Sequence, residues 1–311
     1  MDDAKYTVIY QALHGSRAFG LQGPESDRDV KGIIVGPRSW YHGYRAAPEQ
    51  IELTPEHTLY DIRKFFRLAV AANPTALELL WVDQQHYQVV TGPARLLIGA
   101  RAQFLSLRVK ETFSGYAMSQ LRRIKGHRSW LLHPPGEKPT RAVFGLPEHS
   151  IVSRDQLGAA EALLGRGALY EAELSPNFLD VMDRERRYRS AKQQWDQYQS
   201  WLANRNPQRA QLEARFGYDT KHAQHLVRLL RMGIEILETG EVPVLRTDRD
   251  ELLAIRDGQW SYDALIDYVD RLETRVQLAA EHSPLPERPD EDALNRLCVR
   301  IVEMALDAAL S

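Results

Sequence analysis

The chain contains the stretch His14-Gly15-Ser16-Arg17-Ala18-Phe19-Gly20, followed by Ser26-Asp27-Arg28-Asp29-Val30-Lys31-Gly32. A Gly-Ser turn at the start of an expected short helix exposes backbone N–H groups and a hydroxyl. Such groups suit the oxygens of a polyphosphate. Gly15 and Ser16 are therefore candidate phosphate ligands, and Arg17 is a candidate for either a phosphate contact or a structural ion pair.

Two carboxylates stand where the chain enters an apolar run. Asp27 and Asp29 precede Ile33-Ile34-Val35. Residues two apart on a strand face the same side, so both carboxylates would point at one place and repel each other unless a divalent cation lay between them. Oxygen ligands beside a phosphate site favour Mg²⁺ or Mn²⁺ over zinc. The pattern predicts a metal site at Asp27 and Asp29.

The order and spacing of these two motifs carry more information than either motif alone. Gly15-Ser16 followed by Asp27-x-Asp29 resembles the signature of the DNA polymerase beta nucleotidyltransferase superfamily. The resemblance implies two divalent ions and a nucleoside triphosphate as substrate. A two-metal site needs a third acidic side chain to hold the second ion.

Three residues are candidates for this third carboxylate: Glu52, Glu56 and Asp61. Glu56 is favoured because it would begin a strand on the same face as Thr58 and Tyr60, beside the strand that follows Asp29. Asp61 stands at an expected helix start, where a capping role is the simpler explanation. In the superfamily an aspartate is more usual at the position of Glu56, which would give the longer glutamate a looser geometry.

Hydrophobic periodicity predicts a mixed first third and a helical remainder. Strands are expected over residues 6–10, 30–35, 51–53 and 58–60, and helices over 61–72, 75–81 and 290–310. Thr75 is the expected N-cap of the second helix, with Glu78 as its capping-box partner. Residues 127–153 are rich in Pro and Gly and predict a long loop. The fold class is α/β (α+β), with a mixed-sheet nucleotidyltransferase domain over residues 1–100 and a mainly helical substrate-binding domain over residues 101–311.

Further motifs narrow the resemblance to a polymerase-beta-like nucleotidyltransferase family linked to an RNA repair pathway. They extend over residues 6–279 and comprise Leu59-Tyr60-Asp61-Ile62-Arg63-Lys64-Phe65, Ala72-Asn73-Pro74, Leu77-Glu78-Leu79-Leu80-Trp81, Phe113-Ser114-Gly115-Tyr116 and Gly217-Tyr218-Asp219-Thr220-Lys221-His222. The resemblance implies transfer of a nucleoside monophosphate to an acceptor hydroxyl, with an RNA end, such as that of a tRNA, as the acceptor. Transfer to a protein side chain or a small molecule is the alternative, and a non-catalytic nucleotide sensor is a third.

One basic stripe is expected on a helix that begins after Gly217-Tyr218-Asp219. Lys221, His225 and Arg228 lie along one face at helical spacing. They could bind phosphate and neutralise charge on leaving pyrophosphate. A solvated stripe, or histidines packed in the interior, is the alternative.

Arginines mixed with aromatic residues form a candidate RNA contact. Arg186, Arg187 and Arg189 are interleaved with Tyr188 and Trp195. Arginine contacts phosphate and aromatic rings stack on bases, although such a pattern can also be a solvated helix with a packed aromatic face.

Composition limits the remaining possibilities. The net charge of −2 argues against binding nucleic acid over the whole surface, and the single cysteine, Cys298, excludes an internal disulfide. The sequence shows no signal peptide and no apolar run long enough to cross a bilayer. A cytoplasmic enzyme with no membrane contact is expected.

Overall fold

The structure is a computed structural model that describes residues 6–24, 26–150, 153–165, 175–205 and 207–308. Contacts between residues divide the chain into two units. Unit 1 comprises residues 1–125 and 218–311, and unit 2 comprises residues 126–217. The first and last parts of the chain therefore fold together, and each unit is described below by itself.

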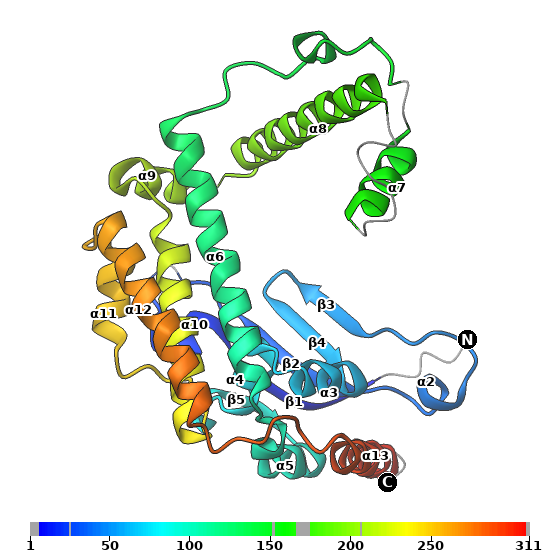
Figure 1. Ribbon diagram of the computed structural model, residues 1–311. Helices are drawn as coiled ribbons and strands as arrows, with labels where there is room; N and C mark the ends of the chain where they lie inside the picture. Colours follow the sequence, from blue (N-terminus) through cyan, green and yellow to red (C-terminus); the bar gives the residue numbers. More distant parts are fainter. Residues whose placement is uncertain (1–5, 25, 151–152, 166–174, 206, 309–311) are drawn as a thin grey trace. The chain divides into compact units, whose positions relative to one another are not determined.

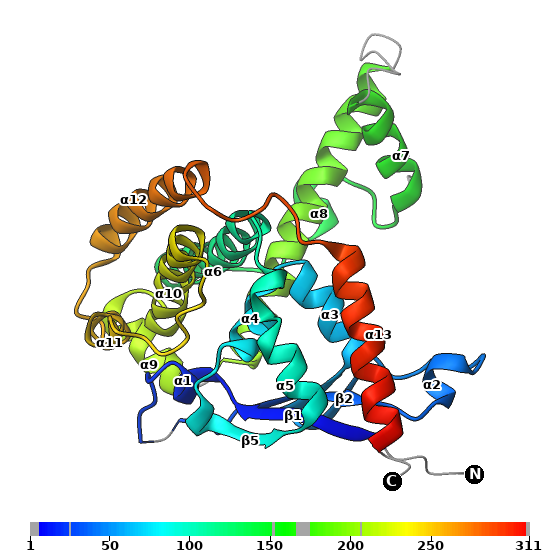
Figure 2. The same cartoon turned by 90° about the horizontal axis from the view of Figure 1, so that it is seen from below.

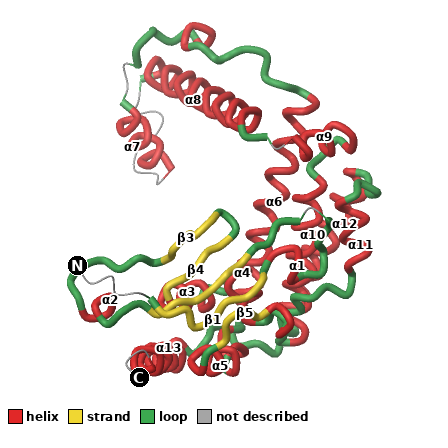
Figure 3. The backbone as a smooth tube through the Cα atoms, turned by 180° about the vertical axis from the view of Figure 1, so that it is seen from behind, coloured by secondary structure: helices red, strands yellow, loops and turns green. Residues whose placement is uncertain are grey.

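A mixed five-stranded sheet is the centre of unit 1 (Figure 3). Its strands follow the order β3-β4-β2-β1-β5 and are β1 (Thr7–Leu13), β2 (Val30–Val35), β3 (Gln50–Thr54), β4 (His57–Asp61) and β5 (Tyr87–Val90). β2 and β4 run parallel, with Val30 opposite His57, and the other neighbouring pairs are antiparallel. The mixed sheet predicted from the sequence is confirmed.

Helices cover one face of this sheet (Figure 2). α3 (Ile62–Val70) contacts β2 and β4, α5 (Gly92–Gly99) contacts β1, and α13 (Glu291–Ala308) packs on α3, α5 and β2. α3 buries the apolar residues expected from its helical spacing, namely Ile62, Phe65, Phe66 and Ala69. Asp61 caps α3 by accepting from the Arg63 N–H, as predicted. The predicted last two residues of the final helix lie outside the described residues.

The short helix α4 (Pro74–Leu80) begins one residue earlier than the capping-box pattern predicted. Its N-cap is Asn73, whose side chain accepts from the Ala76 N–H, and the prediction of Thr75 as N-cap is wrong. Proline is common at the first position of a helix, so the residue before Pro74, which is Asn73, becomes the N-cap. The side chain of Glu78 is therefore not needed for capping.

The other helices of unit 1 follow in the second half of the chain (Figure 1). They are α10 (Thr220–Thr239), α11 (Arg249–Arg256) and α12 (Tyr262–Glu281), and α10 packs on both others. Asp219 caps α10 through the His222 N–H, and Gly240 ends it with φ +71°. Two four-residue helices, α1 (Gly15–Ala18) and α2 (Ser39–His42), lie near the N-terminus of the chain.

Unit 2 is helical. α6 (Arg108–Leu132) begins in unit 1 and ends in unit 2, and it is followed by α7 (Arg154–Gly165), α8 (Pro176–Ala203) and α9 (Pro207–Phe216). Unit 2 also contains a single-turn helix at Arg141–Phe144, and unit 1 contains two more at Gln84–His86 and Arg101–Phe104. The predicted loop over 127–153 is wrong at its start, because α6 continues to Leu132, and residues 151–152 lie outside the described residues. The Pro and Gly residues of this segment all lie after Leu132. The final turns of α6 contain no proline and no residue with a left-handed backbone, so nothing ends the helix earlier.

The fold class is the expected one, a mixed-sheet part followed by mainly helical chain. The two units do not separate at residue 100, since the C-terminal helices pack with the sheet. The division into a catalytic domain over 1–100 and a substrate-binding domain over 101–311 stays a prediction about function. Among the described residues, no helix has both the length and the apolar character needed to cross a membrane.

Candidate functional site

A pocket of about 370 Å³ lies in unit 1 where the turn after β1 meets α4 and α10. Pockets of this size accommodate small ligands. The turn contributes His14, Gly15, Ser16, Phe19 and Leu21. The pocket therefore includes both residues of the Gly-Ser motif.

Gly15 and Asp29 are in direct contact in this pocket. Gly15 has φ +65°, and a Cβ at this position would stand 2.0 Å from the Oδ2 atom of Asp29. The backbone also joins the two segments, because the His14 N–H donates to the Asp29 carbonyl at 2.9 Å. Only glycine combines this conformation with this closeness. The structure thus holds a carboxylate against the Gly-Ser turn.

The three predicted metal ligands, Asp27, Asp29 and Glu56, lie near one end of the sheet, but their carboxylates do not form one cluster. Asp29 is half-buried in the pocket, whereas Asp27 is exposed and does not line it. Both precede β2, so the alternation of strand residues does not apply to them. Glu56 lies in the turn just before β4, not on the strand, and its carbonyl accepts from the Val30 N–H at 2.8 Å.

The carboxylates of these three residues are available to a ligand. Among the described residues, no hydrogen bond or ion pair engages the side chains of Asp27, Asp29 or Glu56. They also do not form a group whose ligand atoms all lie within 4.8 Å of one another. Glu52, the other candidate, is exposed on β3 and accepts from Gln50.

Two residues that the motifs did not single out complete the sheet side of the pocket. Lys31 and Tyr60 line it, and the Lys31 Nζ donates to the Thr58 Oγ1 at 3.1 Å. Lys31 follows Asp29 by two residues, and Tyr60 follows Thr58 by two on the paired strand. The parity of two neighbouring strands therefore places Lys31 and Tyr60 on the same face of the sheet, and both line the pocket that Asp29 also lines.

The basic stripe of α10 forms the facing wall. Lys221, His225 and Arg228 all line the pocket, so the predicted helical face is correct. Arg228 is only 3% exposed, and its guanidinium donates to the Glu78 carboxylate at 2.6 Å and lies over the ring of Phe19. The charge of Arg228 is therefore already paired inside the protein.

Two histidines in the pocket are held neutral by burial. Burial lowers the pKa of His14, and the nearby Glu78 carboxylate opposes this effect. Burial, with a further contribution from Arg228, lowers the pKa of His225 from 6.5 to about 3. The pocket thus combines neutral imidazoles, a paired arginine and two lysines.

The buried His225 makes stability depend on pH. Since its pKa is lower in the folded chain, its contribution is fully present above pH 6.5 and disappears as the pH falls towards 3. Between pH 8 and pH 5, we expect the free energy of unfolding to drop by about 2 kcal/mol more in the wild type than in His225→Gln. Glutamine can still accept from Arg228. Urea unfolding of both proteins across this range measures the difference, and parallel curves would contradict the assignment.

Arg17 makes a structural contact beside the pocket turn. Its guanidinium donates to the Ser26 carbonyl at 3.2 Å, and Arg17 is not among the residues that line the pocket. This hydrogen bond ties the turn to the segment that carries Asp27 and Asp29. A phosphate contact of Arg17 stays a prediction.

The predicted RNA-contact residues lie on α8 of unit 2. Arg186 and Arg187 both pair with Asp183, and Arg189 pairs with Glu185. Glu185 is itself bound by Arg141. Three arginines of α8 and Arg141, from an earlier single-turn helix, therefore share two carboxylates, which leaves a local excess of positive charge beside these carboxylates.

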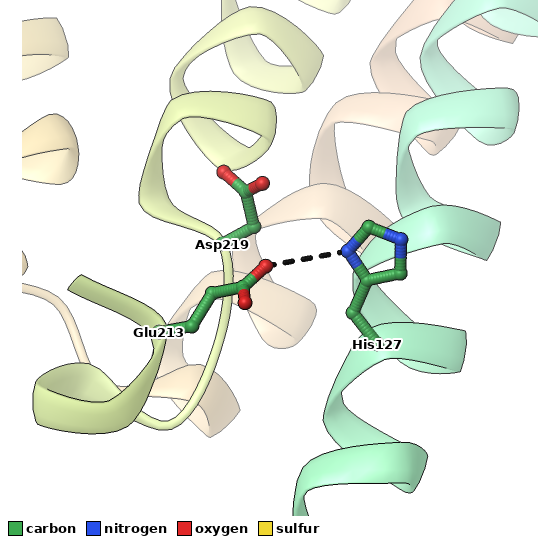
Figure 4. Close-up of side chains that lie close together, drawn as sticks. All are labelled: His127, Glu213 and Asp219. Carbon is green, nitrogen blue, oxygen red and sulfur yellow. Dashed lines mark hydrogen bonds and ion pairs between the residues drawn. The ribbon is translucent and has the colours of Figure 1, made fainter. Parts of the chain in front are cut away.

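A second feature of unit 2 is an aromatic cluster formed by His127, Trp130, Tyr198 and Trp201. His127 is fixed by the Glu213 carboxylate at 3.3 Å (Figure 4), and Arg205 lies over the ring of Trp201. The third labelled residue of Figure 4, Asp219, belongs to unit 1 and caps α10. The aromatic and ionic contacts of unit 2 hold the end of α6 against α8 and α9.

Sequence reasoning missed several pocket residues, among them His14, Lys31, Tyr60 and Gln224, and gave Glu78 a different role. For Lys31 a signal was present, since it stands in the expected strand 30–35 that follows Asp27-x-Asp29. Nothing local points to Glu78, whose partner Arg228 is 150 residues away.

Comparison with known proteins finds a family match for the first part of the chain. Residues 2–131 match the RNA repair pathway DNA polymerase beta family, which confirms for this part the polymerase-beta-like resemblance predicted from the sequence. The predicted extension of the likeness to residue 279 stays a prediction.

A curated relative gives a shorter match. Over 94 residues the chain is 36% identical to the uncharacterized protein YcgL of Bacillus subtilis (strain 168), covering 29% of this chain and 36% of that protein. The chain thus spans about a third of the length of this relative. No solved structure matches the chain.

Proposed function

We propose that the chain is a metal-dependent nucleotidyltransferase that moves a nucleoside monophosphate from a nucleoside triphosphate to the hydroxyl of an RNA end. The observation that carries this proposal is the contact between Gly15 and Asp29, which brings the Gly-Ser turn and a carboxylate together in one pocket. The family match over residues 2–131 supports the same reaction class.

The donors in and around the pocket are compatible with hard divalent ions. Carboxylate oxygens without hydrogen-bond or ion-pair partners among the described residues are the ligands that Mg²⁺ and Mn²⁺ prefer. Asp29, Asp27 and Glu56 would hold two such ions. When bound, these ions would lower the pKa of the attacking hydroxyl and neutralise phosphate charge.

The remaining pocket residues would bind and orient the triphosphate. Gly15 and Ser16 offer the turn backbone and a hydroxyl to the β- and γ-phosphates. Lys31 and Lys221 supply positive charge, and Arg228, fixed by Glu78, orients the wall of α10. The acceptor hydroxyl would give its proton to the Glu56 carboxylate as its oxygen forms a bond to the α-phosphorus. The bond from that phosphorus to the bridging oxygen breaks, and pyrophosphate leaves with the electron pair.

Transfer is tested by incubating the protein with each α-labelled triphosphate, Mg²⁺ and total RNA, then separating RNA from protein. Label on RNA that depends on the enzyme is the expected result. Label on the protein or on a small molecule would support the alternative acceptors. Absence of any transferred label, with all four triphosphates and both Mg²⁺ and Mn²⁺, would contradict the proposal.

The α8 arginines provide a separate test of the acceptor. Changing Arg186, Arg187 and Arg189 together to glutamine should weaken RNA binding and flatten its salt dependence by about one unit of slope for each phosphate that the variant no longer binds. Triphosphate affinity should stay the same because the pocket belongs to unit 1. The measurement is the Michaelis constant for RNA and for nucleotide across a salt series.

A matched control removes the same charge from exposed arginines of unit 1. The residues for this control are Arg271, Arg275 and Arg296, which we expect to leave the salt slope for RNA unchanged. Equal effects of the two triple variants would argue against an RNA contact on α8.

A further inference from the structure

Gln224 of α10 is a pocket residue to which neither the motifs nor the proposed reaction gives a role. It lines the pocket and is only 8% exposed, yet its Nε2 atom has no hydrogen-bond partner among the described residues. A buried amide without a partner costs free energy, which makes such groups rare outside binding sites. The amide nitrogen carries two donors and calls for an acceptor.

The other unpartnered nitrogen of the pocket has a simpler explanation. The Nε2 atom of His14 also lacks a hydrogen bond, but it faces the Glu78 carboxylate at 3.6 Å. Across the described part of the chain, no carboxylate accepts from the Gln224 amide. Gln224 is therefore the group whose partner is missing.

The charges around Gln224 limit what its partner can be. The neighbouring residues on α10 are His225, which is neutral, and Arg228, whose charge Glu78 already balances. Lys221 lies nearly a turn before Gln224 and is exposed. A phosphate buried at Gln224 would find on α10 no buried cation whose charge Glu78 does not already balance, which is costly. An uncharged acceptor has no such cost.

We propose that the Gln224 amide donates a hydrogen bond to an uncharged acceptor of the nucleoside part of the substrate, either a sugar hydroxyl or a base carbonyl or ring nitrogen. The inference rests on the proposed function and adds a specificity-determining residue to it. The phosphates remain at the Gly-Ser turn and the lysines. Gln224 therefore recognises the nucleoside part of the substrate and does not contribute to binding its phosphates.

The test compares Gln224→Met with the wild-type full chain by calorimetric titration in Mg²⁺. The probes are non-hydrolysable analogues of the four triphosphates, 2′-deoxy and 3′-deoxy forms of the best binder, and inorganic tripolyphosphate. We expect about a tenfold loss of affinity for the best nucleotide, corresponding to one hydrogen bond, and no change for tripolyphosphate. If the partner is a sugar hydroxyl, the variant and the wild type bind one deoxy form equally, whereas a base contact leaves the loss in both deoxy forms.

Thermal unfolding distinguishes binding from a structural role. Methionine has a similar shape and removes a buried unpaired amide, so the melting temperature of Gln224→Met should stay the same or rise. Gln120→Met is the matched control, since Gln120 is a buried glutamine of α6 that does not line the pocket. It should leave all affinities unchanged.

Three outcomes overturn the inference: unchanged nucleotide affinity, an equal loss for tripolyphosphate, or a lower melting temperature with losses for every probe. If the wild type binds and transfers nucleotide while Gln224→Met binds like the wild type, only this inference fails. If the wild type binds neither nucleotides nor tripolyphosphate, the proposed function fails with it.

Discussion

Asp29→Asn should reduce nucleotidyl transfer by about a thousand-fold or more while leaving the fold intact. Asparagine keeps the size of the side chain against Gly15 but removes the negative charge that a divalent ion needs. Loss of a ligand to the ions that stabilise the transition state costs several kcal/mol, which corresponds to a rate factor of about this size. The measurement is the rate of label transfer in Mg²⁺, with thermal unfolding as the check on folding.

The matched control is Asp267→Asn, an exposed aspartate on α12 whose change should leave the rate unaltered. Asp27→Asn is expected to resemble Asp29→Asn even though Asp27 does not line the pocket in this structure. Turnover within about tenfold of the wild type by the Asp29 variant would remove it from the proposed site.

Breaking the Glu78–Arg228 pair should have the largest effect on stability. Both residues are almost fully buried, so Arg228→Met or Glu78→Leu leaves an unpaired charge in the interior, at a cost of about 3 to 5 kcal/mol. The double variant should regain most of the missing stability, because an apolar pair of similar volume replaces a buried ion pair at little net cost. Urea unfolding of the four proteins completes a double-mutant cycle.

Strongly non-additive free energies are the expected signature of this pair. If the two single changes cost less than about 1 kcal/mol each and simply add, Glu78 and Arg228 do not depend on each other. The variants also separate stability from function: the double variant should fold, yet bind triphosphate more weakly because the ion pair no longer fixes the position of α10.

The sequence was informative wherever a feature depends on neighbouring residues. β2 has the predicted bounds because its apolar run is continuous. Asp61 caps α3 because an aspartate just before a helix can accept from a backbone N–H of the first turn. The Gly-Ser turn and the stripe of α10 were recognised from short-range spacing. Each of these signals spans fewer than about ten residues, the scale on which periodicity and capping act.

The missed features depend on contacts between distant segments. Glu78 has a plausible local role as a capping-box partner, and only its ion pair with Arg228 reveals another. Likewise, Gly15 could be any turn glycine until the Asp29 carboxylate is seen against it. The spacing of the two motifs predicts that they form one site, but only the structure shows that Gly15 and Asp29 are in direct contact.

Residues 218–311 fold with residues 1–125 in unit 1, and this affects the choice of fragments for expression. The family match ends at residue 131, but α13 packs on α3, α5 and β2, and α10 provides one wall of the pocket. A recombinant fragment ending at residue 131 would expose to water the apolar surface that α13 covers, and its pocket would lack the wall formed by α10. A fragment that keeps the pocket must therefore include residues 218–308, whereas none of the described residues of unit 2 contributes to the pocket lining.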